Sequence, residues 1–162
     1  NQRIEITWFD QEIENEIYFD MASFSGYLQG SGTTTSQGLE IAGETAFLAR
    51  WRLMANITWN ETESSAKQQR PYRPEWTAAS SLLWQNRSLV AALTARFAWD
   101  SVDTAGAPMP DTERLDASLM VNVTQSLRVT GRIENLTDNR DPQVRDYNQI
   151  PRAAYIGLRY SI

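Results

Sequence analysis

The feature that most constrains the fold is an alternation of apolar and polar residues, which recurs from one end of the chain to the other. In the segment SLVAALTARFAWD, apolar side chains occupy every second position from Leu89 to Trp99. Successive side chains of a β-strand point to opposite faces of its sheet, whereas a helix repeats its apolar residues every three or four positions. The sequence therefore predicts an all-β protein with almost no helix.

About eight segments show this alternation, and most contain about ten residues or more, whereas strands of soluble sheets usually have five or six. They lie near residues 2–19, 26–47, 50–62, 75–86, 88–100, 113–124, 126–138 and 152–162. The connections alternate in length, with short turns near 48–50, 86–88 and 124–126 and long polar loops near 20–26, 62–75, 100–112 and 138–151. This is the layout of an antiparallel up-and-down transmembrane β-barrel, which has long loops outside the cell and short turns on the periplasmic side.

The six tryptophans favour a membrane barrel over a soluble one. They are Trp8, Trp51, Trp59, Trp76, Trp84 and Trp99, and each lies near an end of its predicted strand. From Trp51 to Trp59, about eight residues at about 3.3 Å each and a tilt of about 40° span about 20 Å along a membrane normal. Outer-membrane barrels carry an apolar band of about 25 Å between two girdles of aromatic residues. We expect the six tryptophans to form such a girdle, because the core of a soluble barrel would place bulky aromatics in mid-strand.

The polar face of the predicted strands is rich in charged residues. Its members are Arg52, Asn56, Thr58, Arg96, Asp116, Asn122, Arg128, Thr130, Arg132, Glu134 and Arg159. Burying that many charges in a dry core would cost several kcal/mol each unless they were paired. We therefore expect this face to line a lumen that is wet or filled with polar protein. An eight-stranded barrel has room only for its own side chains, so a larger barrel suits this sequence better.

Composition excludes several classes of function. The chain has no Cys and no His, so it lacks thiolate metal sites, cysteine nucleophiles and the commonest general base. Its net charge of -5 is opposite to that of a nucleic-acid binder. No apolar run approaches the roughly 18 residues of a membrane-spanning helix. We expect no catalytic, cofactor-binding or metal-binding residues.

The order of motifs along the chain resembles the C-terminal barrel portion of TonB-dependent outer-membrane receptors. The resemblance runs from RIEITWFDQEIENEIYF through SQGLEIAGE and LMANITWNETESS to RPYRPEWTAASSLLW, and covers essentially all 162 residues. Its most specific part is LRVTGRIENLTDNRD, in which the penultimate strand ends at Glu134, Asn135, Leu136, Thr137 and Asp138, followed by a last strand with Arg152 and Tyr155. Pro74 and the step from Ser36 to Glu40 also fit the family.

Membership of this family would imply an active transporter in the outer membrane of a Gram-negative bacterium. Such receptors import ferric siderophores, cobalamin and similar nutrients, driven through TonB. They have 22 strands, an N-terminal plug inside the barrel and a segment that contacts TonB. Residues 1–162 would be the last eight strands, without plug or TonB box, with both ends on the periplasmic side. The sequence starts in NQRIEITWF with no signal-peptide pattern, which is expected of a mature or internal piece. Membrane lipid and the barrel assembly machinery would be further partners.

Within that family, the long loops would supply contacts to a metal–siderophore or cobalamin substrate. The polar and aromatic groups best suited to an anionic siderophore are Arg70, Tyr72, Arg73, Arg140, Arg145 and Tyr147. The alternatives are a complete eight-stranded outer-membrane barrel with a structural or adhesin role, a soluble ligand-binding barrel, and, least favoured, an outer-membrane enzyme. In the transporter, the edge strands near 2–19 and 152–162 must pair with further strands, because unpaired edges are not tolerated in lipid.

Overall fold

The computed structural model describes residues 2–19, 24 and 26–161. Within them lie the strands β1 (Gln2–Glu14), β2 (Ile17–Phe19), β3 (Tyr27–Gln29), β4 (Thr33–Phe47), β5 (Trp51–Glu63), β6 (Trp76–Gln85), β7 (Leu89–Trp99), β8 (Thr112–Asn122), β9 (Leu127–Glu134) and β10 (Ala153–Tyr160). The described part of the chain contains no helix long and apolar enough to cross a membrane. The predicted all-β class is confirmed.

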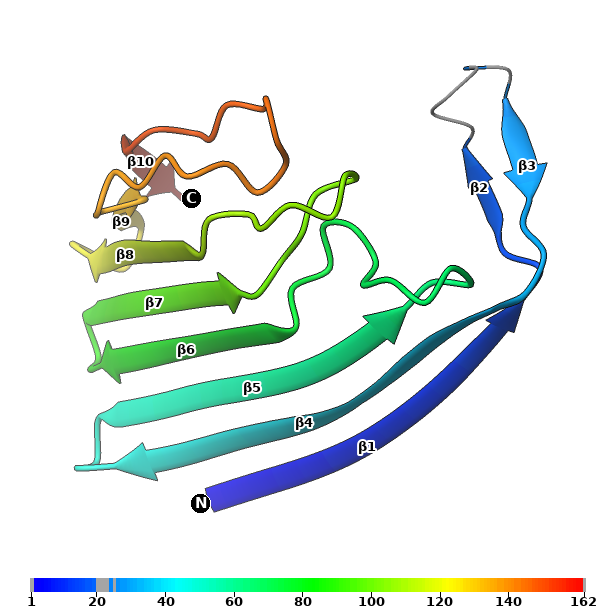
Figure 1. Ribbon diagram of the computed structural model, residues 1–162. Helices are drawn as coiled ribbons and strands as arrows, with labels where there is room; N and C mark the ends of the chain where they lie inside the picture. The colour runs from blue at the N-terminus through cyan, green and yellow to red at the C-terminus, as the bar shows by residue number, and fades with distance from the viewer. Residues whose placement is uncertain (1, 20–23, 25, 162) are drawn as a thin grey trace.

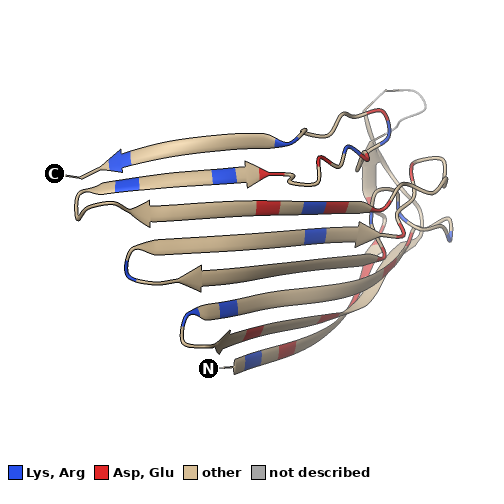
Figure 2. Ribbon diagram, turned by 90° about the vertical axis from the view of Figure 1, so that its left-hand side faces the viewer, with Lys and Arg blue, Asp and Glu red and all other residues tan. Residues whose placement is uncertain are grey.

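Eight of the strands form one curved antiparallel sheet in the order β1-β4-β5-β6-β7-β8-β9-β10 (Figure 1). Each strand pairs with the next one along the sheet, as the predicted up-and-down layout requires. The sheet is not closed, because β1 and β10 are its two edges. Short turns and both chain ends lie at one end of the sheet, which we call the turn end (Figure 2). The loops 64–75, 100–111 and 135–152 lie at the opposite, loop end.

The first two predicted strands are each interrupted, and this is a correction to the sequence-based boundaries. Asn15 adopts a left-handed φ of 54°, and Gly32 a φ of 106°. Asn tolerates this conformation and Gly adopts it freely, so the chain turns out of the sheet at both points. Between them, β2 and β3 pair as a separate two-stranded sheet (Figure 1). Most of the loop predicted near 20–26, and Ile162 at the end of the last predicted strand, lie outside the described residues.

The penultimate strand also ends earlier than the alternation indicates. β9 stops at Glu134, because Asn135 has a φ of 54° and Asp138 a φ of 53°. Both residue types tolerate the left-handed region, and their side chains can bond to nearby backbone groups. The predicted strand end at position 138 is therefore wrong, and residues 135–138 belong to the loop.

The register separates the residues of the sheet into a polar face and an apolar face. One row across the strands runs from Asn56 through Ala79 and Arg96 to Arg114. The neighbouring row, on the opposite face, runs from Ile57 through Ala78 to Phe97. All eleven polar residues expected to share a face do so in this register.

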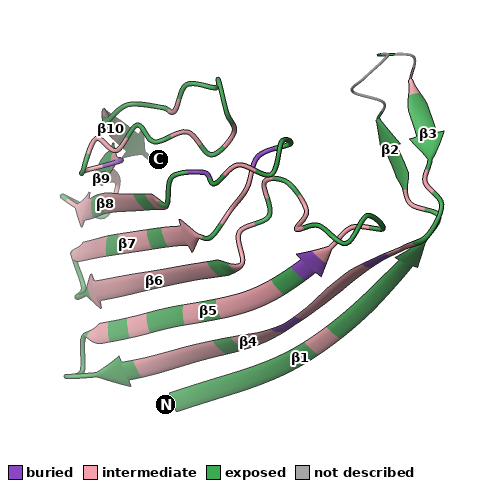
Figure 3. Ribbon diagram, in the orientation of Figure 1, coloured by how far each residue is buried: buried purple, intermediate pink, exposed green. Residues whose placement is uncertain are grey.

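Very little of the sheet is buried, as Figure 3 shows. Met109, with 8% of its surface exposed, is the one hydrophobic residue classed as buried among those described. On the apolar face, Ile4 is 77% exposed and Ile156 is 84% exposed. Exposed apolar surface on this scale is unfavourable in water. The apolar face therefore requires a cover that the sheet itself does not supply.

Gly38, in the motif SQGLE, leaves room for an aromatic ring on the polar face. Phe9 is paired with Gly38 across β1 and β4. A Cβ atom at Gly38 would lie 2.4 Å from Phe9 Cζ and 2.2 Å from the backbone oxygen of Trp59. Because the second contact is with backbone, it cannot be relieved by a side-chain rotation. The glycine is thus required by the close packing of β1, β4 and β5.

We predict that Gly38→Ala lowers the free energy of unfolding by about 1–3 kcal/mol, which is typical of overpacking. The matched control is Gly43→Ala in the same strand, where the nearest atom to a new Cβ is 3.7 Å away. Denaturant unfolding followed by tryptophan fluorescence measures both variants. Equal stability of the two variants would contradict the steric role of Gly38.

Candidate functional site

Loop 135–152 folds back over the polar face at the loop end of the sheet and encloses a cavity of about 350 Å³. Strands β5 to β8 contribute polar residues (Asn56, Thr77, Arg96, Thr112, Glu113 and Arg114) and apolar ones (Ala78, Ala79, Phe97 and Ala98), and the loop contributes Asn135, Asn139, Asp141, Gln143, Gln149 and Ile150. A second cavity of about 210 Å³ shares Thr112 and Gln143 with the first and is lined by Tyr72 and Met109. We call the two together the rim cleft. Its walls offer many hydrogen-bond donors and acceptors, so it suits a polar ligand.

Arg96 and Arg114, which line the rim cleft, belong to a network of ion pairs across β7, β8 and β9. Asp116 accepts from Arg96 Nη1 at 2.7 Å and from Arg114 Nε at 3.0 Å. Glu134 is bridged to Arg114 Nη2 and to Arg132 Nη2, each at 3.3 Å. Three arginines thus share two carboxylates. Their charge is largely neutralised, and the cleft presents guanidinium N–H donors without acting as a strong anion trap.

Asn135 ties the two ends of loop 135–152 together and is only 3% exposed. Its Nδ2 donates to the carbonyls of Asn139 at 2.8 Å and Ile150 at 3.1 Å. Its Oδ1 accepts from the backbone N–H of Asn139 at 3.0 Å and from Thr137 Oγ1 at 3.4 Å. Its own N–H donates to Asp116 Oδ1 at 2.8 Å, which links the loop to the ion-pair network. The Asn that directly follows β9 therefore closes the loop and anchors it to the strands.

Asp138 makes a second closure of the same loop. Its Oδ1 accepts from the backbone N–H of Arg152 at 2.8 Å, and Arg140 Nη2 lies 3.1 Å from its Oδ2. The N–H of Arg152 and the guanidinium of Arg140 hold the pKa of the Asp138 carboxyl below its usual range. The carboxylate therefore stays ionised and bonded at neutral pH, and it fixes the entry into β10.

Asp103 connects loop 100–111 to loop 135–152 and is 4% exposed. Its Oδ1 accepts from the backbone N–H groups of Ala105 and Ala107, both at 2.9 Å, and its Oδ2 pairs with Arg145. The N–H of Ala107, with Ala105 and the Arg145 guanidinium, holds the pKa of Asp103 below its usual range. Loop 64–75 joins the other two through the N–H of Tyr72, which donates to the carbonyl of Val102 at 2.8 Å. The three loops form one connected rim.

The six loop residues expected to contact a ligand differ in their surroundings. Arg70 pairs with Glu16, Arg140 with Asp138, and Arg145 with Asp103, so these three cations are used in holding the loops. Tyr72 alone of the six lines a cavity described above. Tyr147 is 71% exposed. The carbonyl of Arg73 accepts from Gln69 Nε2 at 3.3 Å. Ligand contact by these residues remains a prediction.

Sequence reasoning placed the ligand side in the loops and missed the strand residues that line the rim cleft. Arg96 and Arg114 lie on the polar face near the loop ends of β7 and β8. The alternation places Arg96 on that face, but only the fold of loop 135–152 makes it a cavity wall. Gln143 and Gln149 join the cavity for the same reason. No pattern in the sequence predicts where a long loop will fold.

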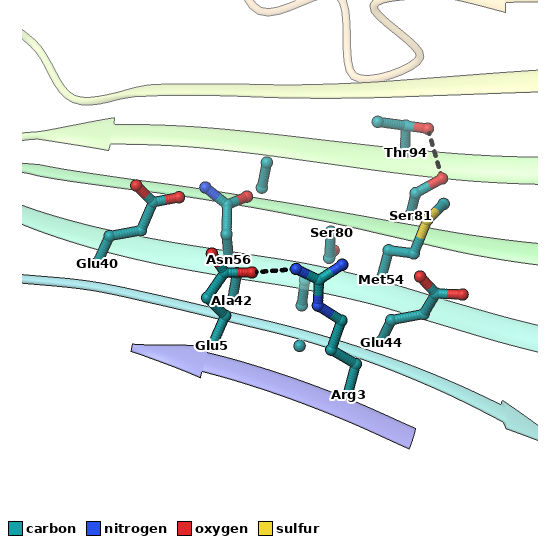
Figure 4. A pocket seen from close by; sticks show the side chains of 13 residues that line it. Arg3, Glu5, Glu40, Ala42, Glu44, Met54, Asn56, Ser80, Ser81 and Thr94 are labelled. Carbon is teal, nitrogen blue, oxygen red and sulfur yellow. Dashed lines mark hydrogen bonds and ion pairs between the residues drawn. The ribbon is translucent and has the colours of Figure 1, made fainter. Parts of the chain in front are cut away.

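A separate depression of about 400 Å³ lies on the polar face between β1 and β7 (Figure 4). Glu5, Glu40 and Glu44 line it, and Arg3 donates to Glu5 at 2.7 Å. Its floor includes small residues such as Ala42. The surface is therefore acidic and shallow, in contrast to the rim cleft. Among the described residues, no group of three or more acidic, His or Cys side chains is arranged to hold a metal ion.

The tryptophans form two rows on the apolar face. At the loop end, Trp76 is paired with both Trp59 and Trp99, and the Trp8 ring lies 6.3 Å from that of Trp59. Trp59 Nε1 donates to Glu75 Oε1 at 3.0 Å, so the polar atom of this half-buried side chain has a partner.

At the turn end, Trp51 is paired with Trp84, and Phe47 stacks on Trp51 at 6.3 Å. The two rows therefore lie at opposite ends of the strands, with aliphatic residues such as Leu53 and Ile57 between them. That these two rows form a girdle at two membrane surfaces remains a prediction.

Comparisons with known proteins agree with this fold. A family model described as "TonB dependent receptor-like, beta-barrel" matches residues 1–136. No curated protein matches the sequence significantly. The structure of the siderophore receptor PiuA from Acinetobacter baumannii is similar with a TM-score of 0.79 and 16% identity, over 98% of this chain and 26% of that one.

Two further structures extend the comparison. The ferric-catecholate import receptor Fiu from E. coli K12 has a TM-score of 0.73 and 18% identity, over 98% of this chain and 25% of that one. The copper transporter OprC has a TM-score of 0.78 and 11% identity, over 99% of this chain and 29% of that one. At these identities the likeness concerns the fold alone. The chain spans about a quarter of the length of PiuA and Fiu.

We predict that Asn135→Ala loosens loop 135–152. The substitution removes four side-chain hydrogen bonds, each worth about 0.5–1.5 kcal/mol. Asn135→Gly separates this effect from backbone strain, because Gly adopts the left-handed φ and still lacks the side chain. Hydrogen exchange across the loop should accelerate in both variants. The control is Asn148→Ala, an exposed Asn in the same loop. Unchanged exchange in Asn135→Gly would show that the side chain does not hold the loop.

Proposed function

The chain belongs to the TonB-dependent receptor-like β-barrels, and on this premise we propose that it forms part of the wall of an outer-membrane receptor that imports a scarce nutrient. The observation that carries the proposal is the uncovered apolar face bounded by two rows of tryptophans, with a polar cleft at the loop end of the opposite face. Lipid covers the apolar face in this proposal, and the polar face lines the lumen. The host is a Gram-negative bacterium.

The cargo proposed first is a ferric siderophore, with cobalamin as the other cargo typical of such receptors. PiuA is a siderophore receptor, Fiu imports a ferric catecholate and OprC transports copper, so similar barrels serve different metals and chelates. The rim cleft supports a polar cargo, because Arg96, Arg114 and Tyr72 offer hydrogen-bond donors and an aromatic ring at its walls. This segment would bind and orient cargo and perform no covalent chemistry.

Energy for import would come from TonB, acting on parts of the receptor outside these residues. A plug inside the barrel would be displaced, while the wall described above stays in place. The pairing of loops 64–75, 100–111 and 135–152 supports a rigid rim, since each is bonded to another. The barrel assembly machinery would insert the chain into the membrane.

The open sheet favours a larger barrel over the alternative of a complete eight-stranded barrel with a structural or adhesin role. β1 and β10 are edge strands and do not pair with each other. Edges left in lipid would expose unpaired backbone groups, each costing several kcal/mol. Further strands on both sides, as in a larger barrel, satisfy these groups. The wide curvature of the sheet in Figure 1 supports the larger barrel.

Uptake measurements test the proposed transport. A strain lacking the receptor that contains this segment should lose uptake of one labelled cargo from a panel of ferric catecholate, ferric hydroxamate, cobalamin and copper. The same loss is expected on deletion of TonB or collapse of the proton gradient, since import is driven through both. Re-expression of the receptor restores uptake and serves as the control. Uptake of every cargo at the wild-type rate in the receptor deletion would refute the proposal.

The membrane placement of the tryptophans gives an independent prediction. In lipid bilayers, quenchers attached near the headgroups should quench tryptophan fluorescence more strongly than quenchers at the bilayer centre, because Trp prefers the interface. A receptor variant with Leu93→Trp provides the contrast, since Leu93 lies on the apolar face in mid-strand, at the row of Leu82 and Leu53. This new tryptophan should respond to the central quencher. Strong central quenching of the native set would contradict the girdle.

A further inference from the structure

We propose that the smaller cavity of the rim cleft is a subsite for an apolar group of about the size of a phenyl ring, carried by a ligand whose polar part lies in the larger cavity. The inference rests on the proposed function in one respect, namely that this ligand is the cargo. The apolar lining of the subsite, which we call the ring slot, consists of Tyr72, Pro74, Ala98, Met109, Pro110 and Pro142.

The two cavities of the rim cleft differ in charge. The larger one is lined by the charged residues Arg96, Glu113, Arg114 and Asp141. None of the described residues that line the ring slot is charged. An apolar group gains free energy on entering such a cavity, whereas a charged group would lose its hydration without finding a partner. The ring slot therefore favours the apolar part of a ligand and leaves the polar part to the larger cavity.

The backbone around the ring slot offers few free hydrogen-bond donors. Three of its residues are prolines, which have no N–H group. The N–H of Tyr72 donates to the carbonyl of Val102, and the N–H of Met109 donates to the carbonyl of Ser101, each at 2.8 Å. A polar ligand group would gain little from these backbone groups, whereas an apolar group leaves none of them without its partner.

Size and side-chain type fit a phenyl ring. The ring slot has a volume of about 210 Å³, and an apolar cavity of about 150 Å³ is large enough to hold benzene. Met109 supplies a thioether, which makes favourable contacts with aromatic rings, and Tyr72 supplies an aromatic ring, which packs against another edge to face. Because Met109 is only 8% exposed, its side chain is packed within the wall.

The ring slot lies where loops 64–75, 100–111 and 135–152 meet, since each of them supplies part of its lining. Figure 1 shows the first two loops side by side at the loop end of the sheet. The pairing of Asp103 with Arg145 joins the last two. The walls are thus held together before a ligand enters, and a preformed pocket lowers the entropy cost of binding.

Tyr72 is held in an unusual backbone conformation at the wall of the ring slot. Its φ is 56°, a left-handed value that is exceptional for a bulky residue. Conformations of this kind cost free energy and concentrate at sites that hold ligands. The bond from its N–H to Val102 keeps Tyr72 in this position. The strained backbone of Tyr72 thus supports a role of this residue in ligand contact.

The ring slot adjoins the larger cavity, because Ala98, Thr112 and Gln143 line both. In the larger cavity, Arg96 and Arg114 offer guanidinium N–H donors. A ligand in which a phenyl group is joined to a polar part rich in hydrogen-bond acceptors would place each part in matching surroundings at the same time.

A pair of neutral ferric chelates tests the proposal in the complete receptor. Ferric tris(benzohydroxamate) and ferric tris(acetohydroxamate) have the same hydroxamate–iron core, and the first carries phenyl groups where the second carries methyl groups. Isothermal titration calorimetry on the purified receptor in detergent measures the affinity of each. We expect the phenyl chelate to bind about tenfold more tightly, as is typical of burying an aromatic group.

Two variants locate the bound phenyl group. Ala98→Leu narrows the ring slot, and Tyr72→Gly removes its aromatic wall while keeping a residue that adopts the left-handed φ. Each should lower the preference for the phenyl chelate to about twofold or less, because the apolar contact is lost. The matched control is Ala92→Leu, which lies on the same strand and face but lines neither cavity, and which should keep the full preference. Heat-modifiable migration on gels confirms that each variant is folded.

The proposal is overturned if the two chelates bind with equal affinity or if neither binds. A preference for the phenyl chelate that persists in both Ala98→Leu and Tyr72→Gly would also overturn it, since the phenyl group would then lie elsewhere in the receptor. Cargo uptake measured in parallel separates the two proposals. A phenyl preference that depends on the ring slot, in a receptor that imports no cargo of the panel, refutes only the transport function, and uptake without a phenyl preference refutes only the ring slot.

Discussion

The structure depends on the difference between the two faces of one sheet. Its apolar face is exposed along β1 and β10, and the described residues contain almost no buried hydrophobic side chain. Its polar face carries arginines and carboxylates that need water or polar partners. No single solvent suits both faces, so the sheet needs apolar surroundings on one side and water or polar protein on the other. The two rows of tryptophans lie at the two ends of the apolar face.

At the loop end, the acidic and amide side chains mainly form hydrogen bonds with backbone groups. Asn135, Asp138 and Asp103 each bond to N–H groups of their own or neighbouring loops. The arginines Arg140 and Arg145 complete these arrangements, so much of the positive charge in the loops is used for structure. The rim cleft is consequently a set of hydrogen-bonding groups held on a rigid frame. In the proposed receptor, a cargo at this cleft would be recognised by shape and hydrogen bonds more than by net charge.

The charge of the polar face differs from region to region, both along and across the strands. Near β1 and β4 it is acidic, with Glu5, Glu40 and Glu44 around a shallow depression. Across β7, β8 and β9 the charges are paired, and at the turn end of β9 and β10 two arginines face each other. A protein segment packed against this wall would therefore meet acidic, neutralised and basic regions in a fixed order. In the proposed barrel, such a pattern can define the register of a segment that packs against this wall.

Much of the fold was predictable, because side-chain direction in a strand depends only on local position. The alternation identified the strands, the three short turns and the face of residues such as Arg96. The alternation did not predict the strand ends at Asn15 and Asn135, where the backbone takes a left-handed φ. The apolar–polar pattern continues past these residues, so it does not reveal a change in φ. The candidate site was predictable only in part. Tyr72 lines the rim cleft, but the pairing of Arg70 with Glu16 joins positions far apart in the chain.

The sequence by itself determined that the chain forms long antiparallel strands with one apolar and one polar face, because a period of two is a local property of the backbone. Only the tertiary structure decided which charges neutralise one another, where loop 135–152 folds, and that Arg128 lies opposite Arg159. These features depend on the register between strands and on contacts between distant loops. Register and loop contacts arise when separate segments pack together, and no single segment of the sequence carries that information.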